Sequence, residues 1–537
     1  MAPTDGIGAA NGDGAAPIEA QPPGTIGCPH PPEDPVCITF DKGQEAAELE
    51  AKLLCTRILP GWGDLKPEQM QVSKVSGGIS NLLVKVQPPA PLRPVAVKVF
   101  GDKTELLIDR EAEKRTLLQL NALGFGAPVV GLFENGRVEA FLDCITLNPE
   151  QMADPRFVPH IASRLRSFHE LPMAEPPGLP SAADAFDSTL AAEGQAAADG
   201  SRRSASGSGA SAAVAAVAAA AAAAEAAAPG YRSALPRPSP QSSQWDAIFG
   251  WLEMAEALTF DHDPKKAEAF AKVDFPALRK ELSALWALCR RVRSPRVFCH
   301  NDLLSGNILI VHGEPPPAGA AASAPPASSS AGAADDVLGG GWLQFIDFEY
   351  SCYGERGFDL GNHFNEYAGF DCEYGRFPTP EQQKAFFRSY LRPGELRDLA
   401  IALLASSPDL VSASAQSSAP ASALAPGSPA GQPGPSPGPE GPGSGPDGPL
   451  LAAAEALVLD RLVAEACVFA LASHAYWGVW SYIQARYSPI DFDYLSYSEL
   501  RWAEYRRRRE EFLGLVDRCF PQGQGQGGAA AEAAQRH

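Results

Sequence analysis

The amino-acid sequence predicts an α+β fold in which a small β-rich lobe precedes a larger helical lobe. Two observations support this prediction. Between residues 71 and 144, short apolar runs are separated by glycine-containing turns, a pattern typical of β-strands. After about residue 145, apolar residues recur at helical spacing over long segments. Strands followed by helices along one chain indicate that the two kinds of element occupy separate lobes.

The β-rich lobe is predicted from three apolar segments and one helix. Residues 71–87 form two apolar runs around a Gly-Gly pair, and residues 95–100 (VAVKVF) form a further strand. Residues 131–142 place an Asn-Gly pair between apolar runs, which is a strong hairpin signal. Leucines among charged residues between 106 and 120 indicate an amphipathic helix. We therefore predict an N-terminal lobe over residues 36–144.

The helical lobe is predicted from the spacing of apolar residues further along the chain. Helical periodicity extends over residues 158–170, 245–259, 275–292, 381–392 and 450–486. Thr379 and Pro380 begin one of these helices as its N-cap and its first-turn proline. We predict a C-terminal lobe over residues 145–520.

Five stretches of low complexity flank or interrupt this pattern: residues 1–35, 177–243, 313–341, 405–449 and 521–537. Between residues 426 and 449, for example, 17 of 24 residues are Pro or Gly. Such a composition buries too little apolar surface to offset chain entropy, so we predict disordered tails and inserts. About 344 residues remain, which is enough for two lobes around one cleft rather than for several domains.

Charge and composition exclude several classes of protein. The chain carries 64 Asp and Glu against 44 Lys and Arg, a net charge of −20, which argues against nucleic-acid binding because phosphate neutralisation needs clustered cations. Residues 210–228 contain 15 Ala and one Glu, and Ala gives too little transfer energy for a membrane span. The ten cysteines form no CxxC pair, and no export signal is visible. We therefore expect a cytoplasmic protein with free thiols.

The densest chemical signal is the segment HNDLLSGN at residues 300–307, followed by an apolar strand that ends in Asp347. An H-x-D-x-x-x-x-N loop before such a strand is typical of phosphoryl transfer from ATP. Asp302 would orient the acceptor hydroxyl and take its proton. The oxygen atoms of Asn307 and Asp347 would hold Mg²⁺, because hard cations prefer oxygen ligands. His300 is grouped with Asp302 as a catalytic candidate, and bracing of the loop is favoured over proton transfer by this side chain.

Each of these residues also has an ordinary structural interpretation. A single Asp at the end of a strand is usually a cap or a turn residue, and the loop pattern alone arises by chance in long chains. Both elements in the correct order, flanked by strands and preceded by a strand lysine, are much harder to explain by coincidence. The low-complexity segment between them can loop out at modest entropic cost.

Lys98 lies within the VAVKVF strand and is the candidate for contact with the ATP phosphates. An edge-strand lysine on the solvent side is the alternative interpretation. The helix that follows offers Glu111 or Glu113 as its ion-pair partner, and we favour Glu111. A turn over the phosphates is predicted at the motif SGGISN, with candidates Ser76, Gly77, Gly78 and Asn81.

Taken together, these motifs resemble the choline/ethanolamine kinase family. The resemblance rests on five blocks between about residues 74 and 500: SGGISN, VAVKVFGDKTELLIDRE, VFCHNDLLSGNILI, FIDFEYSCYGERGFDLGNHFNEYAGFD and FALASHAYWGVWSYIQARYSPIDFDYLSY. Within the family, GNHFNEYAG is most similar to ethanolamine kinases. The resemblance implies a protein-kinase-like fold that uses ATP and Mg²⁺. It also implies phosphorylation of ethanolamine, the first step of the CDP-ethanolamine route to phosphatidylethanolamine.

The resemblance also implies roles for individual residues. Asp302 becomes the catalytic base, Asn307 and Asp347 the Mg²⁺ ligands. Lys98 departs from the family pattern, which often has Arg at this strand position. Residues implied near the acceptor are the acidic Glu349, Asp359 and Glu366 and the aromatic Tyr350, Trp477 and Trp480.

The two tryptophans have two interpretations. At helical spacing they are ordinarily core residues, whereas the resemblance favours an aromatic wall whose ring faces attract an ammonium group. Because such a wall suits ethanolamine and choline alike, a choline-preferring or dual-specificity kinase stays open. A non-catalytic scaffold and an aminoglycoside-type phosphotransferase are the rivals from other classes. The intact Asp302, Asn307 and Asp347 argue against the first of these rivals, and the NHFNEYAG segment argues against the second.

Overall fold

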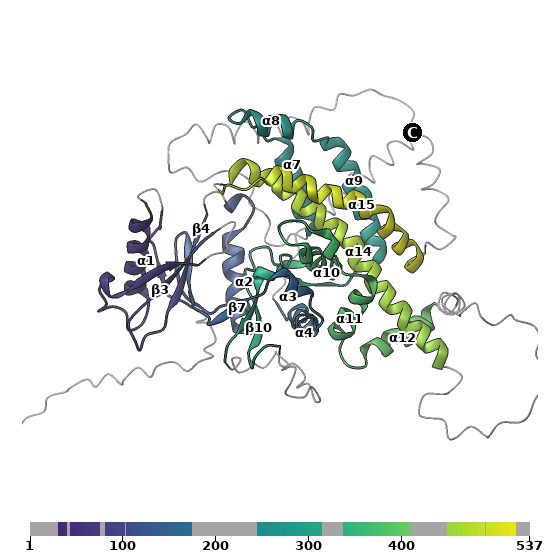
Figure 1. The fold of residues 1–537 in the computed structure, drawn as a ribbon, viewed down its shortest axis with the longest axis horizontal. Helices are drawn as coiled ribbons and strands as arrows, with labels where there is room; N and C mark the ends of the chain where they lie inside the picture. The colour runs from purple at the N-terminus through teal and green to yellow at the C-terminus, as the bar shows by residue number, and fades with distance from the viewer. Residues whose placement is uncertain are drawn as a thin grey trace, which may run out of the picture.

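The computed structural model describes residues 30–39, 43–75, 81–101, 104–173, 244–313, 337–407, 409, 448–488 and 490–521. These residues form two lobes, with the β-rich lobe on the left of Figure 1 and the helical lobe on the right. The arrangement confirms the predicted α+β fold. Among the described residues, no helix combines the length and the apolar character needed to span a membrane.

A six-stranded sheet forms the N-terminal lobe, with the strand order β1-β5-β6-β4-β3-β2. Its strands are β1 (Glu33–Asp34), β2 (Gln71–Lys74), β3 (Asn81–Gln87), β4 (Val95–Phe100), β5 (Val129–Phe133) and β6 (Gly136–Ala140). Neighbouring strands are antiparallel, except that β1 pairs parallel with β5. Valines of β3, β4 and β6 pack against helix α1 (Gln44–Ile58) and form a core of their own.

The β5–β6 hairpin confirms the Asn-Gly signal and shows why glycine is required there. The turn is formed by Glu134 and Asn135, and Gly136 is the first residue of β6. A Cβ atom on Gly136 would lie 2.2 Å from the carbonyl oxygen of Lys98 and 2.2 Å from the Phe133 ring. The hairpin therefore approaches the central strand as closely as only glycine permits.

The β-rich lobe begins before its predicted start at residue 36, and its predicted end at residue 144 lies within one residue of the change of lobe. Residues Glu33–Asp34, assigned to a disordered tail, form β1 because their backbone completes the edge of β5. At the other end, β7 (Cys144–Thr146) pairs with β9 (Ile308–Val311) and so belongs with the strands of the helical lobe. In the predicted 313–341 insert, Val337 and Leu338 pack against the main core. Most of the predicted inserts and tails lie outside the described residues.

Ten helices of the described chain build the C-terminal lobe: α3 (Pro149–Ala153), α4 (Val158–His169), α7 (Gln244–Glu256), α8 (Pro264–Phe270), α9 (Phe275–Val292), α10 (Arg356–Asn365), α11 (Pro380–Tyr390), α12 (Glu395–Ser406), α14 (Gly448–Tyr487) and α15 (Tyr494–Cys519). The five predicted helices are confirmed, with ends within about three residues of the prediction. The Thr379 side chain accepts the Gln382 backbone N–H, which confirms the predicted cap of α11.

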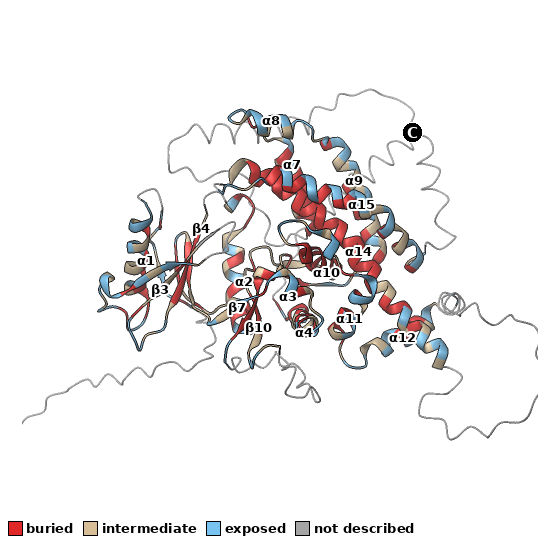
Figure 2. Ribbon diagram, viewed as in Figure 1, coloured by how far each residue is buried: buried red, intermediate tan, exposed pale blue. Residues whose placement is uncertain are grey.

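Helix α14 is the central element of this lobe. It runs for 40 residues and is buried over most of its length, as the red ribbon in Figure 2 shows. A helix that is apolar on all sides must be surrounded by other elements, and α14 contacts α7, α9, α10, α11, α12 and α15. This packing places Trp477 beside Asn362 of α10 and Trp480 beside Tyr350.

Three further strands and one short helix complete the region around that loop: β8 (Arg296–Cys299), the 3₁₀ helix η3 (Ser305–Asn307), β10 (Trp342–Phe345) and β11 (Cys352–Glu355). Strand β9 lies between β7 and β10, and β11 pairs with β8. Because β9 and β10 are antiparallel neighbours, the beginning of β9 lies next to the end of β10. The register therefore brings the 300–307 loop and the residues after Phe345 together.

Candidate active site

The loop 300–307 leaves β8 through a backbone conformation that few residues adopt. Asn301 has a φ of 67° and Asp347, on the facing loop, has a φ of 65°. Both lie in the left-handed region, which Asn and Asp tolerate better than other non-glycine residues. Such conformations persist only where surrounding contacts hold them, and the contacts of this loop are dense.

His300 braces the loop and has no free ring nitrogen for proton transfer. Its Nε2–H donates to the carbonyl oxygen of Ile346 at 3.0 Å, and its Nδ1 accepts the backbone N–H of Asp302 at 3.3 Å. Burial lowers the pKa of His300, so the ring is neutral near pH 7. The grouping of His300 with the catalytic residues is therefore corrected to a bracing role, because both nitrogens are committed to the protein.

Asp302 and Asn307 are held against each other. The Nδ2 of Asn307 donates to the backbone oxygen of Asp302 at 2.8 Å and to its Oδ2 at 3.1 Å. The Asn307 carbonyl accepts the N–H of Ile346 at 3.1 Å, which places Asn307 beside the residue that precedes Asp347. Burial raises the pKa of the Asp302 carboxyl well above its usual range, and the nearby charges of Glu366, Asp347 and Glu349 raise it further. Such a carboxyl group is suited to accept a proton.

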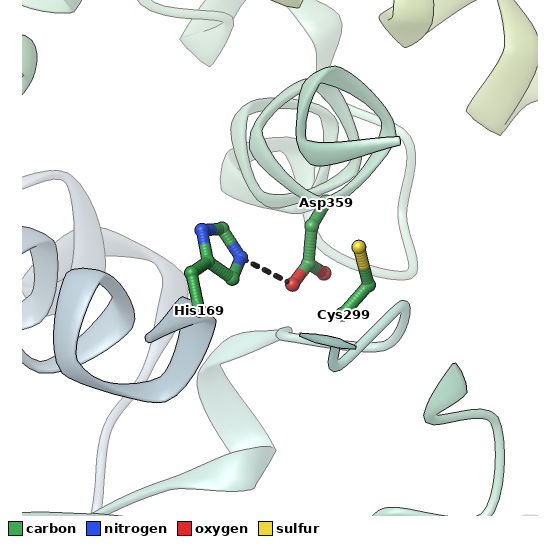
Figure 3. Close-up of side chains that lie close together, drawn as sticks. All are labelled: His169, Cys299 and Asp359. Carbon is green, nitrogen blue, oxygen red and sulfur yellow. Dashed lines mark hydrogen bonds and ion pairs between the residues drawn. The ribbon is translucent and has the colours of Figure 1, made fainter. Parts of the chain in front are cut away.

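Asp359 of α10 holds the beginning of the 300–307 loop in place. Its carboxylate is fully buried and accepts the backbone N–H groups of His300 and Asn301, each at 2.7 Å. It also accepts the Nε2–H of His169 at 2.9 Å, the contact drawn in Figure 3. The other nitrogen of His169, Nδ1, lies 2.7 Å from the Tyr390 hydroxyl. The contacts of the Asp359 carboxylate thus go to the loop backbone and to His169, and its place near the acceptor stays a prediction.

Cys299 lies beside Asp359 and His169 in Figure 3, and the ligand atoms of the three residues fall within 4.8 Å of one another. The thiol of Cys299 points to the carbonyl oxygens of Val297 and Glu355, and burial raises the pKa of this thiol well above its usual value. A metal ligand would need the thiolate. Since the other two side chains are already hydrogen-bonded, we interpret the cluster as a structural network.

Lys98 reaches the end of the catalytic region from the β-rich lobe. Its Nζ pairs with Oδ1 of Asp347 at 2.6 Å, and its side chain is 9% exposed. Burial acts to lower the pKa of Lys98, but the negative charges of Asp347, Glu349 and Glu113 together outweigh it and raise the pKa. Lys98 is thus a buried cation at the junction of the lobes rather than a solvent-side strand lysine.

The helix carboxylate at this junction is Glu113, not Glu111. Glu111 is exposed in the first turn of α2 (Arg110–Ala122), whereas Glu113 is buried. Glu113 pairs with Arg137 at 2.5 Å and with Arg110 at 2.6 Å. Burial acts to raise the pKa of Glu113, but Arg137, Arg110 and Lys98 outweigh it and lower the pKa to about 2. The preference for Glu111 fails because the helix turns its 113, 117, 120 face inward.

Arg110 connects this cluster with the helical lobe. Its Nη1, which holds Glu113, also lies 3.2 Å from Oε2 of Glu349, and its Nη2 donates to Thr104 at 2.6 Å. Its guanidinium lies 4.2 Å from the centre of the Phe100 ring. Glu349, predicted near the acceptor, is thus ion-paired with the helix of the β-rich lobe.

The predicted phosphate turn is mostly outside the described residues. Ser76, Gly77 and Gly78 are not among the described residues. For Asn81, the structure describes the backbone only. This residue is the first of β3 and pairs with Phe100 at the end of β4. The motif therefore leads directly into β3, the strand that pairs with β4, in which Lys98 lies.

The aromatic residues predicted to form a wall lie together in one cluster, in which both tryptophans are buried. The ring centroids of Trp477 and Trp480 lie 5.3 Å apart, and Trp477 and Tyr350 also lie 5.3 Å apart. Both indoles are fixed by hydrogen bonds: Trp477 Nε1 donates to Asn362 at 2.8 Å, and Trp480 Nε1 donates to the Tyr350 hydroxyl at 3.0 Å. Tyr350 follows Asp347 by three residues, so the cluster borders the catalytic region.

Glu366 approaches the same region from the end of α10. It begins the 3₁₀ helix η4 (Glu366–Ala368), and its Oε1 accepts Nη1 of Arg501 at 3.1 Å. Among the neighbouring negative charges, that of Glu366 raises the pKa of Asp302 the most. Glu366 is therefore close enough to Asp302 to affect its charge, and its place near the acceptor stays a prediction from the resemblance.

The sequence did not predict several residues of this region: Arg110, Arg137, His169, Asn362 and Arg501. Arg137 had one available signal, because the hairpin register places it directly opposite Lys98. His169, Asn362 and Arg501 meet their partners through contacts between distant segments, such as α4 with α10 for His169.

One cavity lies elsewhere. It has a volume of about 690 Å³ and lies between α9 and α15, where Leu278, Tyr482 and Trp502 contribute to its lining. None of the predicted site residues lines it, so the catalytic region is identified by its chemistry and not by cavity size.

Comparisons with known proteins point in the same direction. The sequence pattern of the choline/ethanolamine kinase family matches residues 72–506. A probable ethanolamine kinase of Arabidopsis thaliana is 30% identical over 466 residues, which cover 86% of this chain and 86% of that protein. The choline/ethanolamine kinase of Homo sapiens is 24% identical over 487 residues, covering 87% of this chain and 88% of that protein.

Among solved structures, the ethanolamine kinase of Plasmodium vivax is similar with a TM-score of 0.53 and 23% identity, covering 86% of this chain and 89% of that one. This similarity confirms the protein-kinase-like, two-lobed fold. The matched range 72–506 includes every predicted site residue of the sequence.

Proposed function

The chain belongs to the choline/ethanolamine kinase family, and on this premise we propose that it transfers the γ-phosphoryl group of ATP to the hydroxyl oxygen of ethanolamine. The observation that carries the proposal is the joint placement of Asp302 and Asn307, in one loop, with Asp347, which follows 40 residues later and is brought beside them by the pairing of β9 and β10. The product would be phosphoethanolamine, which enters the CDP-ethanolamine route to phosphatidylethanolamine.

In this proposal Asp302 orients the acceptor hydroxyl and takes its proton as the new O–P bond forms. The hydrogen bond from Asn307 fixes one oxygen of the carboxylate, and the bonds of His300 and Asp359 fix the loop backbone. Positioning and electrostatics provide most of the rate enhancement in such reactions. The raised pKa of Asp302 makes the carboxylate a better proton acceptor than an exposed aspartate.

Asn307 and Asp347 are proposed to hold Mg²⁺. The donor set fits this ion, because amide and carboxylate oxygens are the ligands that Mg²⁺ takes in nucleotide sites. The Nδ2 of Asn307 is turned to Asp302, so the amide oxygen remains for the metal. When bound, Mg²⁺ would supply charge neutralisation on the ATP phosphates. Lys98 is proposed to contact the same phosphates as a point charge.

The acceptor is proposed to lie between the aromatic cluster and the carboxylates. The indoles of Trp477 and Trp480 and the ring of Tyr350 supply faces that attract a cation. The carboxylate of Glu366 supplies a hydrogen-bond acceptor for the ammonium group. Ethanolamine is preferred over choline in the proposal because the more similar relatives are named ethanolamine kinases.

The test is a substrate panel on the purified full chain with ATP and Mg²⁺. We expect ADP release with ethanolamine, and a kcat/KM for ethanolamine above that for choline. A tenfold preference for choline would replace the proposal by choline kinase activity. Turnover of a bulky amino-sugar without turnover of ethanolamine would replace it by aminoglycoside-type phosphotransfer, and absence of all turnover would support a scaffold.

A cytosolic location remains a prediction from the sequence. It is supported by the buried cysteines Cys55, Cys289, Cys299, Cys467 and Cys519, which carry thiols without disulfide bonds, as expected of a reducing compartment. Fractionation of cells that express the chain would test it.

A further inference from the structure

Arg501 of α15 is a charged side chain with no role in the chemistry described so far. It is 2% exposed, and a fully buried arginine is rare unless its charge is paired. Its Nη1 donates to Oε1 of Glu366 at 3.1 Å and to the Tyr497 hydroxyl at 3.2 Å, while its Nη2 donates to the Ser473 hydroxyl at 3.0 Å. The guanidinium is therefore fixed from several sides.

These bonds continue through Ser473 and Asn362 to the aromatic cluster and the catalytic loop. The Ser473 hydroxyl donates to Oδ1 of Asn362 at 2.7 Å, and the same oxygen accepts Nε1 of Trp477 at 2.8 Å. The Nδ2 of Asn362 donates to the carbonyl oxygen of Asn301, next to Asp302, at 3.1 Å. A single buried network thus fixes a carboxylate, an indole and the catalytic backbone relative to one another.

The presence of a buried cation beside a site proposed to bind a cation needs a physical reason. Charge attraction alone would be stronger without Arg501, because its positive charge partly cancels that of Glu366. What the guanidinium supplies is geometry: Ser473 holds Nη2, and the rigid plane then directs Nη1 at one oxygen of the Glu366 carboxylate. A fixed acceptor favours a ligand with N–H donors. A primary ammonium has three such donors, and a trimethylammonium has none.

We propose that Arg501 is a specificity-determining positioning residue, which orients the Glu366 carboxylate to accept N–H hydrogen bonds from a primary ammonium group. The proposal rests on the proposed function, because it assumes that the acceptor is an amino alcohol bound beside Glu366. Arg501 itself does not contact the acceptor. It sets the preference for a primary over a quaternary ammonium.

The experiment compares Arg501→Gln and Arg501→Lys with the wild-type chain in steady-state assays with ethanolamine and with choline. Arg501→Gln should lower kcat/KM for ethanolamine by about tenfold or more, the order expected for a hydrogen bond to a charged group. The kcat/KM for choline should fall much less, so that the ethanolamine-to-choline ratio drops at least fivefold. Arg501→Lys retains the charge without the fork and should restore the ratio only in part.

A matched control is Arg356→Gln. Arg356 pairs with the buried Glu465 at 2.6 Å at the start of α10, so its loss disrupts another largely buried ion pair without contacting the network. This control should lower the melting temperature and leave the substrate ratio unchanged. If Arg501→Gln does not fold, Tyr497→Phe removes only one hydrogen bond of the guanidinium and should shift the ratio in the same direction by a smaller factor.

The outcomes separate the inference from the proposed function. If wild type uses ethanolamine and the ratio falls in the Arg501 variants, the inference is supported. Equal losses for both substrates, or an unchanged ratio, would show that Arg501 is merely structural. If wild type does not phosphorylate ethanolamine at all, the proposed function fails first, and the inference fails with it.

Discussion

Two buried groups of polar residues meet at the catalytic loop, and they are built in different ways. The first, the charge cluster, consists of Lys98, Arg110, Glu113, Arg137, Asp347 and Glu349. The second, the loop anchor, consists of Asp359 and His169 with the backbone N–H groups of His300 and Asn301. The charge cluster joins side chains across the two lobes, whereas the loop anchor joins one carboxylate to the backbone within a single lobe.

The difference indicates what each group does. Ion pairs between side chains can exchange partners, so the Lys98–Asp347 pair can yield to nucleotide phosphates and a metal ion without refolding. Hydrogen bonds from two successive backbone N–H groups to one carboxylate fix the backbone itself, here at a residue with a left-handed φ. We therefore expect changes in the charge cluster to affect nucleotide binding, and changes in the loop anchor to affect both stability and turnover.

The largest effect in this comparison is expected for Asp359→Asn. An amide at this position would direct N–H groups toward backbone donors, so the loop would lose its geometry. We expect kcat to fall by about 100-fold or more and the free energy of unfolding to fall by about 3 kcal/mol. Steady-state kinetics and thermal unfolding measure the two effects.

Asp274→Asn is the control, because Asp274 accepts the N–H of Ala277 on the exposed cap of α9, away from the loop. An unchanged kcat in Asp359→Asn would contradict the role of the loop anchor.

The stability difference between wild type and Asp359→Asn should depend on pH. Burial acts to raise the pKa of Asp359, but the bonds from His169 and from the His300 backbone outweigh it and lower the pKa below its ordinary value. A depressed carboxyl pKa stabilises the fold above the unfolded value of about 4, and the contribution is lost as pH falls through the folded value. The difference in melting temperature between wild type and Asp359→Asn should be constant above about pH 5 and shrink below pH 4. A difference that grows on acidification would contradict this sign.

A smaller effect, and a different one, is expected for Lys98→Met. The variant removes a phosphate contact and leaves the loop backbone in place, so KM for ATP should rise by about tenfold or more while KM for ethanolamine changes little. Lys85→Met on the neighbouring strand β3 is the control, since Lys85 lies over the Phe141 ring and not in the charge cluster. Equal increases in both KM values would show that Lys98 supports the structure rather than the nucleotide.

Smaller still is the effect expected for Arg110→Gln. Glu113 keeps Arg137 as a partner, so we expect a loss of about threefold to tenfold in kcat/KM for ATP and a small decrease in melting temperature. The double variant Arg110→Gln, Glu349→Gln should lose less than the sum of the two single variants, because the two residues contact each other at 3.2 Å. Strict additivity would show that this contact does not couple the lobes.

The smallest effect is expected for Tyr390→Phe. Tyr390 contacts the far nitrogen of His169 and touches neither Asp359 nor the loop. Turnover should stay within about twofold of wild type, with a loss of about 1 kcal/mol in stability. Thermal unfolding and kcat on the same preparation would test this, and a large fall in kcat would extend the loop anchor to α11.

The sequence predicted those parts of the site that lie in short motifs. Asp302, Asn307 and Asp347 were located because a strand, a loop and a second strand follow one another with only one insert between them. Glu113 was within reach of the same reasoning, since it shares the helical phase of Leu117 and Leu120, which face inward. Glu111 lies on the opposite, exposed face of the same helix.

The remaining residues could not be predicted because their roles depend on long-range packing. In the sequence, Asp359 looks like an ordinary polar residue of an amphipathic helix. The residues around it in the sequence give no sign that its carboxylate accepts the backbone N–H groups of His300 and Asn301. Arg501 meets Glu366 across 135 residues of sequence, because α15 and α10 both pack on α14. The tail boundary at residue 35 failed for a similar reason, because β1 is defined only by its partner β5.

The central claim is that this chain phosphorylates ethanolamine with Asp302 as its proton acceptor. The most direct measurement is ³¹P NMR of the full chain incubated with ATP, Mg²⁺ and ethanolamine, next to the variant Asp302→Asn. The account predicts a phosphoethanolamine signal for wild type and formation slower by a factor of about 10²–10⁴ for the variant. Absence of phosphoethanolamine in the wild-type sample, or equal rates in the two samples, would contradict it.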